Sequence, residues 1–313
     1  MIDQTPIATK ILMFLEGFAA WALYGLFRLL PIHWCSALGA KLGRFQGAER
    51  RIVISRIQKN LLWLLPSISE SDRLAISHTM IKNAGRSYYE TMIVDRLLAN
   101  DRVNTSPPEH IRKQLSAGKP LILVTVHLAN LGDLIIASLA DLLLRQYGYE
   151  VGGSPTRKMT NPWLSSLATH IRDRYLKGIN GRGYDPDLKT ARDFYRFLMK
   201  PRSVVLLHLD EAYDRQVHFP TFGRPIDPRG NVTKAIKLAA GTGAVIQPVY
   251  LTRESTELGF KVSWVPAFQV ESNGASLNQA SLMRYAQHLD ELFEPRVFEN
   301  LVDWAQICYL RSE

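Results

Sequence analysis

Cysteine, low-complexity sequence and internal repeats are scarce in this chain. Only two of its 313 residues are cysteines, Cys35 and Cys308, and they lie far apart and match no CxxC or metal-ligand spacing. This excludes a disulfide scaffold and a cysteine-based zinc site, so we predict two small buried hydrophobic side chains. The absence of repeats and low-complexity linkers excludes solenoid architectures. The nucleophilic serine motif GxSxG is also absent.

The charge and the apolar residues of the N-terminal segment indicate a membrane. Residues 1–60 hold eight Lys and Arg against three Asp and Glu, which is five of the nine net positive charges. The apolar run ILMFLEGFAAWALYGLF (11–27) contains one charge, Glu16, and carries Trp21 and Tyr24, which suit a lipid headgroup boundary. A bilayer span takes about 20 apolar residues, so this run is a marginal span or an interfacial helix. We predict that residues 1–30 form a membrane anchor; the alternative is a buried core helix.

The basic residues that follow this run predict its orientation. Next to anionic lipid they favour the cytoplasmic face of the inner (plasma) membrane. A cleaved signal peptide is disfavoured because the start of the chain holds Asp3 and only Lys10 as a base. Nucleic-acid binding ranks last, because the basic residues surround an apolar segment and no nucleic-acid-binding motif is present.

Two hydrophobic patterns divide the rest of the chain. Up to about residue 100, apolar residues recur at three and four positions, which is typical of amphipathic helices, with a break at Pro66. From residue 120 onward, buried-type strands such as PLILVTV (120–126), SVVLLHL (203–209) and AVIQPVYLT (244–252) alternate with helices. This alternation predicts an α/β fold with a mixed, mostly parallel sheet covered by helices on both faces. We expect residues 31–313 to form one domain.

Polar side chains follow two of the predicted strands. His127 follows PLILVTV, and His208, Asp210 and Glu211 come at the end of the strand SVVLL. Ligands of open α/β sheets bind beyond the carboxyl ends of the strands, so we predict the functional site there. A histidine at such a place can act as a general base near neutral pH, provided that a carboxylate fixes its tautomer.

We predict Asp133 as the carboxylate that orients His127. Asn130 is a favourable N-cap, which puts Asp133 in the first turn of the next helix, facing back across a short loop. Replacing Asp133 should then lower turnover strongly, and near-normal turnover would point to Asp210 or Glu211 instead. The alternatives are that Asp133 only starts the helix and that His127 is a satisfied core or loop histidine.

Two blocks of this sequence resemble a known enzyme family. GKPLILVTVHLANLGDL (118–134) resembles the strand, histidine and helix block of the lysophospholipid acyltransferase superfamily, and in particular of the late lipid A acyltransferases that attach lauroyl or myristoyl chains. The segment 206–253 is similar to that family's strand, acid, aromatic-Pro-x-Phe-Gly turn, helix, and strand ending in Pro and Arg. Weaker similarity covers most of the remaining chain.

The resemblance implies a glycerolipid acyltransferase-like fold and the transfer of a fatty acyl chain to a hydroxyl of a lipid A-type membrane lipid. The donor it implies is a thioester of acyl carrier protein or of CoA, with no metal and no bound cofactor. Without a GxSxG serine, direct transfer with His127 as base is favoured over an acyl-enzyme. The family pattern puts the acid five positions after the histidine, where this chain has Gly132, and we expect Asp133 to keep that role.

Further side chains are candidates for substrate binding. Arg157, and with less support Arg182, follow the second strand and suit a phosphate on the donor or acceptor. Asp210 and Glu211 are placed to bind acceptor hydroxyls or to start a turn. We expect three residues of the FPTFG turn to shape the loop and an acyl groove: Phe219, Phe222 and Gly223.

Two other functions stay open at this point. One is an acyltransferase for a different acceptor, such as a glycolipid, an amino lipid or a polyketide-type lipid. The other is a catalytically silent homologue that binds lipid or carrier protein, which the displaced acid favours. The sequence favours no particular oligomeric state.

Overall fold

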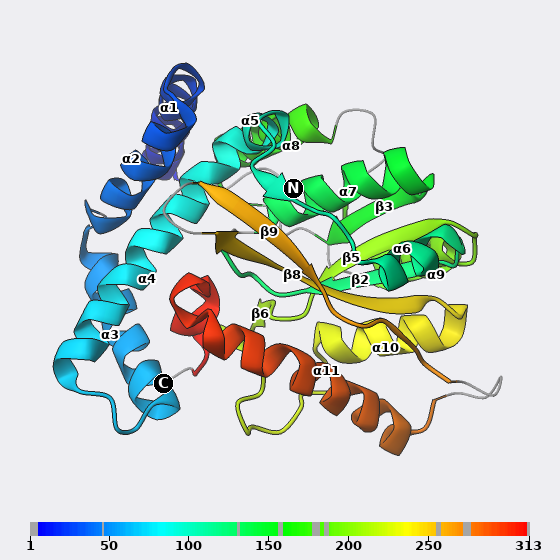
Figure 1. Cartoon of the computed structure of the whole chain (residues 1–313). Coiled ribbons are helices and arrows are strands. Elements are labelled where there is room, and N and C mark those ends of the chain that lie inside the picture. Colours follow the sequence, from blue (N-terminus) through cyan, green and yellow to red (C-terminus); the bar gives the residue numbers. More distant parts are fainter. Residues whose placement is uncertain are drawn as a thin grey trace.

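The structure, a computed structural model, describes residues 6–45, 47–129, 132–155, 159–176, 182–184, 188–254, 258–271 and 277–311. Within these residues the predicted α/β fold is confirmed: a mixed, mostly parallel sheet carries helices on both faces (Figure 1). The strand order is β1-β9-β8-β2-β5-β3-β4, and β10 also pairs with β8. The strands of this sheet are β1 (Val103–Asn104), β2 (Leu121–Thr125), β3 (Glu150–Pro155), β4 (Arg182–Tyr184), β5 (Ser203–His208), β8 (Val245–Glu254), β9 (Gly259–Trp264) and β10 (Phe268–Gln269).

Most of the sheet is parallel, and antiparallel pairing occurs on one side of it. Strands β8, β2, β5, β3 and β4 run parallel to one another, whereas β9 and β10 are antiparallel to β8, and β1 is parallel to β9. The short strands β6 (Ala212–Tyr213) and β7 (Gln216–Val217) form a separate hairpin in the loop after β5. The central strands β2 and β5 are buried along their whole length, as their continuous apolar sequences predict.

The helices follow the predicted division of the chain. The described helices are α1 (Ile7–Leu29), α2 (Ile32–Phe45), α3 (Gly47–Leu64), α4 (Glu70–Glu90), α5 (Val94–Ala99), α6 (Glu109–Ser116), α7 (Asp133–Tyr147), α8 (Pro162–Tyr175), α9 (Leu188–Leu198), α10 (Asn231–Thr242) and α11 (Gln279–Glu299), with 3-10 turns η1 (Thr91–Ile93), η2 (Leu301–Asp303) and η3 (Ala305–Tyr309). The break expected at Pro66 is confirmed: α3 ends before it, and α4 begins after Ser69, whose hydroxyl accepts a hydrogen bond from the backbone N–H of Asp72.

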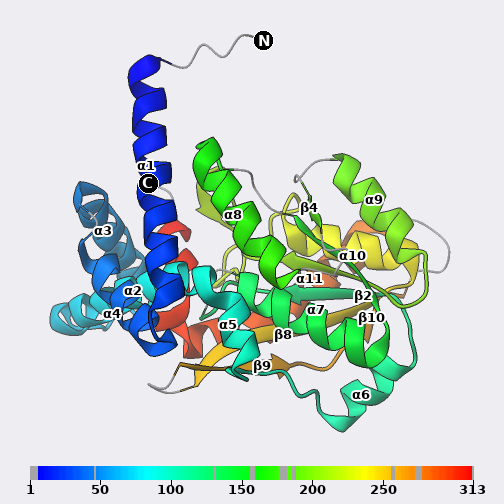
Figure 2. The ribbon, with the colours of Figure 1, turned by 90° about the horizontal axis from the view of Figure 1, so that it is seen from above.

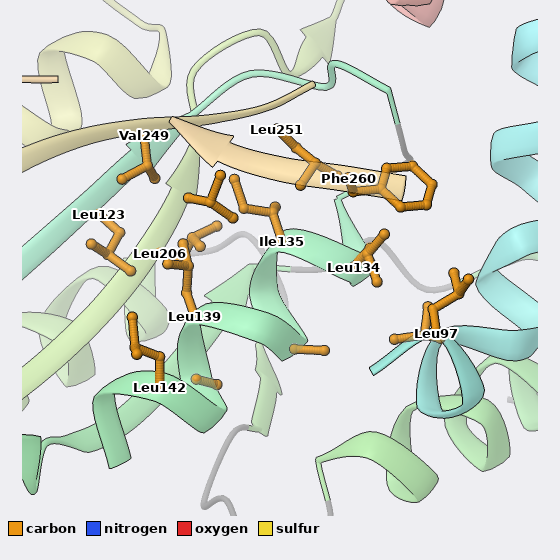
Figure 3. Packing of buried hydrophobic residues seen from close by; sticks show 14 of the residues in the cluster. Leu97, Leu123, Leu134, Ile135, Leu139, Leu142, Leu206, Val249, Leu251 and Phe260 are labelled. Atoms are coloured by element: carbon orange, nitrogen blue, oxygen red, sulfur yellow. The ribbon is translucent and has the colours of Figure 1, made fainter. Parts of the chain in front are cut away.

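Alternate side chains of β2 point into two separate hydrophobic clusters. Leu121 and Leu123 lie in one cluster with residues of α7 and with side chains of β8 and β9 on the same face of the sheet. Figure 3 shows Leu123 in this cluster with Leu139, Leu206 and Val249. Ile122 and Val124 face α9, α10 and α11 on the other side of the sheet. This period of two along the strand explains why the sheet is covered on both faces.

Helix α4 brings the N-terminal half of the chain to the edge of the sheet. It packs closely on α2 because glycines meet there: a Cβ on Gly85 would lie 2.5 Å from the carbonyl oxygen of Gly39. Two residues further along, the hydroxyl of Ser87 donates to the carbonyl of Ala129 at 2.8 Å. The helical half of the molecule therefore holds the loop that follows β2.

Helix α1 is apolar on one side and packed on the other. Among the described residues it is the one helix that is long and apolar enough to cross a membrane by length and composition. Tyr24 and Phe27 are nevertheless buried in the same cluster as Leu121 and Leu123. Figure 2 shows α1 beside α8, with its N-terminal end extending past the rest of the ribbon.

Candidate active site

His127 and Asp210 lie at the carboxyl ends of two neighbouring parallel strands. His127 is two residues beyond the end of β2, and Asp210 is two residues beyond the end of β5. The strands are in register, with Thr125 opposite His208. The register therefore brings together two side chains that are 83 residues apart in the chain.

Asp210 holds His127 by both its backbone and its ring. The Nδ1 atom of His127 is 2.8 Å from Oδ1 of Asp210, and the backbone N–H of His127 donates to Oδ2 at 2.9 Å. The indole N–H of Trp304 also donates to Oδ2, at 2.9 Å. A carboxylate only accepts, so it selects the tautomer with hydrogen on Nδ1 and leaves the lone pair on Nε2.

The charges in this group reinforce each other. Burial opposes the charged form of His127, but the negative charge of Asp210 and its hydrogen bond prevail, and the pKa of His127 is raised above its ordinary value. Burial likewise opposes ionisation of Asp210, but the charge of His127 and the hydrogen bonds from His127 and Trp304 keep the pKa of Asp210 below its ordinary value. The pair is suited to accept a proton on Nε2.

Asp133 is not the partner of His127. It is the first residue of α7, and its Oδ1 accepts hydrogen bonds from Nε of Arg172 at 3.0 Å and from the hydroxyl of Tyr175 at 2.6 Å. At the start of the helix its side chain points to α8 and makes a structural ion pair there. The expected pairing is thus corrected: the carboxylate on His127 is Asp210, one of the two alternatives that the sequence offered.

Gly132 and His208 explain why no acid stands five positions after His127. The His208 ring stacks on the His127 ring, with centroids 4.1 Å apart and planes 19° apart. A Cβ on Gly132, which has φ of +95°, would lie 2.5 Å from Nε2 of His208. The imidazole of His208 thus fills the space that a side chain at position 132 would need. Burial and the neighbouring His127 lower the pKa of His208 well below its ordinary value, so we expect His127 to take up a proton before His208 does.

A buried ion pair fixes the loop after His127. Ala129, at φ of +59°, accepts a hydrogen bond from Nη2 of Arg253 at 3.1 Å and donates its N–H to the carbonyl of Asp303 at 3.1 Å. Arg253 in turn makes two hydrogen bonds to the carboxylate of Glu90, at 2.9 and 2.8 Å. Both side chains of this pair are buried, and Ser36 donates to Glu90 at 2.7 Å. Helix α4 and strand β8 therefore hold the loop at Ala129 together.

The FPTFG turn reaches the site through Trp304. Phe219 is buried and contacts Phe293 on α11, with ring centroids 5.8 Å apart. Phe222 has φ of +48°, and its ring centroid lies 5.7 Å from that of Trp304. Gly223, at φ of +80°, is exposed. The turn packs against the residue that donates to Asp210.

Of the remaining predicted residues, Glu211 follows Asp210 and its negative charge contributes to the raised pKa of His127, and the two arginines lie wholly or partly outside the described part. Glu211 is exposed. Arg157 falls outside the described residues, and Arg182 lies in β4, with its side chain outside the described part. Within the described residues, no group of three or more His, Cys, Asp or Glu side chains is arranged to hold a metal ion.

The sequence did not reveal Trp304, Glu90 or Arg253 as parts of the site. Trp304 is 94 residues from Asp210, and Glu90 is 163 residues from Arg253. A weak signal existed for Arg253, which ends the strand in the block that resembles the acyltransferases, but nothing local linked it to a helix in the first half of the chain.

A partly buried histidine and a buried carboxylate meet at the carboxyl ends of parallel strands in an α/β fold, which is where the ligands of such folds bind. The profile of the family described as bacterial lipid A biosynthesis acyltransferase matches residues 6–308. The chain belongs to this family and is an acyltransferase. No curated protein matches the sequence.

Proposed function

We propose that the protein transfers a fatty acyl chain from a thioester directly to a hydroxyl group of a lipid A-type membrane lipid. His127 is the general base, and Asp210 orients it and stabilises its protonated form. The observation that carries the proposal is the contact of Nδ1 of His127 with Oδ1 of Asp210 at 2.8 Å, which leaves Nε2 to receive a proton. The family supports the lipid class of the acceptor.

In the proposed reaction Nε2 of His127 takes the proton of the acceptor hydroxyl while its oxygen attacks the thioester carbonyl. A C–O bond forms, the C–S bond of the resulting tetrahedral intermediate breaks, and the departing thiolate receives the proton from His127. The products are the acylated lipid and the free thiol of the carrier, so atoms and charge balance. The charge that forms on His127 lies beside Asp210, where it is stabilised most.

The other predicted roles belong to the same proposal. The donor is an acyl thioester of acyl carrier protein or CoA, used without a metal or a bound cofactor, on the cytoplasmic face of the inner membrane. Arg157 and Arg182 contact phosphate, Glu211 contacts the acceptor, and Phe219, Phe222 and Gly223 shape the acyl groove through the turn that packs on Trp304. For Arg157→Ala we expect a higher KM for one substrate with kcat little changed; unchanged kinetics for both substrates would exclude the contact.

An acyl-transfer assay with the purified full-length protein tests the proposed function. Labelled acyl carrier protein and acyl-CoA donors are incubated with a total lipid extract, and mass spectrometry identifies the acylated product. We expect a lipid A-type product with the wild type and none with His127→Ala. An acylated product of another lipid class would show that the acceptor is not a lipid A-type lipid. Binding of lipid or carrier without any product would indicate a catalytically silent homologue.

A further inference from the structure

One face of α1 is apolar and exposed along the whole helix. Seven residues recur there at intervals of four and three, and none is charged. They form what we call the apolar stripe: Ile7, Ile11, Leu15, Phe18, Ala22, Leu26 and Leu29. Ile7 and Leu29, at the two ends, are 77% and 85% exposed, so the stripe extends over all 23 residues. An exposed apolar surface of this length marks a site of contact with a partner.

The opposite face of α1 is covered by the protein. Gly17 lies against α8 so closely that a Cβ there would be 2.2 Å from Cβ of Trp163. The side-chain amide of Asn161, the N-cap of α8, donates to the carbonyl of Met13 at 2.9 Å and to the carboxylate of Glu16 at 3.1 Å. Further along, Tyr24 contacts His170 on α8, with ring centroids 5.6 Å apart. Helix α1 therefore lies along α8 from Met13 onward (Figure 2).

The charges next to α1 lie beside the stripe and on α8. Arg28 contacts Asp95 at 2.6 Å, and Asp95 also contacts Arg174 of α8 at 3.0 Å. Arg174 is 43% exposed, and its neighbour Asp173 is exposed as well. On a helical wheel of 100° per residue, Lys10, Glu16 and Arg28 fall outside the stripe.

These contacts distinguish between an α1 that crosses the bilayer and an α1 that lies along its surface. With 23 residues α1 is about 34 Å long, so length alone allows it to cross a hydrocarbon core of about 30 Å. Crossing would also draw into the hydrocarbon the start of α8, which is packed beside α1 from Met13 onward, together with the carboxylate of Glu16 and the side-chain amide of Asn161. Charged groups at that depth are costly. Lying along the surface immerses only the stripe, by about 5–10 Å, and leaves the charges at the level of the headgroups.

We propose that α1 lies along one leaflet of the membrane with its apolar stripe in the lipid and does not cross the bilayer. The inference rests on the membrane attachment within the proposed function, and it adds the depth and the orientation. The partner is the surface of a lipid bilayer, and the face of α1 that would be polar in an ordinary interfacial helix is packed on α8 instead. The N-terminal end of α1 and the His127 site are then on the same side of the membrane.

Depth measurements along the stripe test this orientation. A nitroxide label is attached to each of three single-cysteine substitutions of the full-length protein: Ile7→Cys, Leu15→Cys and Leu26→Cys. Each labelled protein is then bound to vesicles of phosphatidylethanolamine and phosphatidylglycerol. Cys35 is buried and Cys308 is partly buried, so the labelled wild type supplies the background. A label at Leu74→Cys, an exposed position on α4, supplies the control in water.

We expect the three stripe labels to report the same shallow depth and the label at 74 to stay fully accessible to an aqueous relaxation agent. A deep label at 15 with shallow labels at 7 and 26 would show a span and overturn the proposal. A steady gradient from 7 to 26 would show perpendicular insertion, and three fully aqueous labels would show no membrane contact; both results overturn it as well. Catalysis plays no part in this measurement, so a failed acyl-transfer assay and a failed orientation are separate results.

Charge substitutions supply a second readout. Leu15→Glu and Phe18→Glu should each weaken binding to the same vesicles by at least about 10-fold, because a carboxylate in the stripe would have to enter the lipid. Leu74→Glu, which exchanges an exposed apolar side chain on α4, should bind as the wild type does. Equal binding of all four proteins would contradict the proposal.

Discussion

Asp210→Asn should lower kcat for acyl transfer by about two to four orders of magnitude and leave the fold intact. The amide has the same shape, but it has no charge to stabilise the protonated His127, and it can select the wrong tautomer of the ring. The variant should also shift the pH profile. The pKa of His127 is raised by Asp210 against the opposing effect of burial. The base is active when neutral, so activity falls as the pH drops through this pKa.

In the wild type this loss should be centred above pH of about 6.5, the ordinary value for histidine. In Asp210→Asn the effect of burial remains without its counterbalance, so the residual activity should persist to lower pH. Rate against pH for both proteins checks the direction of the shift. Asp133→Asn is the matched control: it removes the negative charge that pairs with Arg172 and leaves a weaker acceptor for Arg172 and Tyr175, so it should lower Tm and change kcat little. A larger loss of kcat in Asp133→Asn than in Asp210→Asn would return Asp133 to the role of partner.

Gly132→Ala should lower kcat by about 100-fold with a smaller effect on KM. The added Cβ would lie 2.5 Å from Nε2 and 2.8 Å from Cε1 of His208, and the ring of His208 can retreat only against the stacked ring of His127. A displacement of about 1 Å at a catalytic group can cost about 100-fold in rate. The positive φ adds strain of about 1–2 kcal/mol to the folded state, which a lower Tm should report.

The opposite end of the same helix provides the control for this substitution. Gly148 also has a positive φ, of +66°, but a Cβ there would meet no atom within 4 Å. Gly148→Ala should therefore lower Tm by strain alone and leave kcat unchanged. If both alanine variants lose Tm equally and neither loses kcat, the contact between Gly132 and His208 has no part in catalysis.

The local features of the site could be predicted from the sequence. The apolar run 120–126 predicted a buried strand, and β2 occupies residues Leu121–Thr125 of it. The same holds for β5, and both strand ends carry the polar side chains that the sequence singled out. These features depend on the alternation of apolar and polar residues over a few positions, which a single sequence contains in full. The family resemblance stated from two blocks is confirmed over residues 6–308.

The choice between Asp133 and Asp210 needed the tertiary structure. Proximity in sequence favoured Asp133, which lies six positions from His127, whereas Asp210 reaches His127 only through the parallel register of β2 and β5. That register depends on contacts between distant segments, and so do the donation from Trp304 and the ion pair that fixes Ala129. Helix α7 also begins two residues later than an N-cap at Asn130 would place it, with Gly132 as its N-cap, and Asp133 points to α8.

The sequence by itself determined the α/β class, the strand ends that carry the site, His127, and the apolar length of α1, because each depends on residues close together in the chain. Only the tertiary structure decided which carboxylate meets His127, why position 132 holds a glycine, and which face of α1 is left exposed. Each of these depends on packing between segments far apart in the chain: β2 beside β5, His208 beside Gly132, and α8 beside α1.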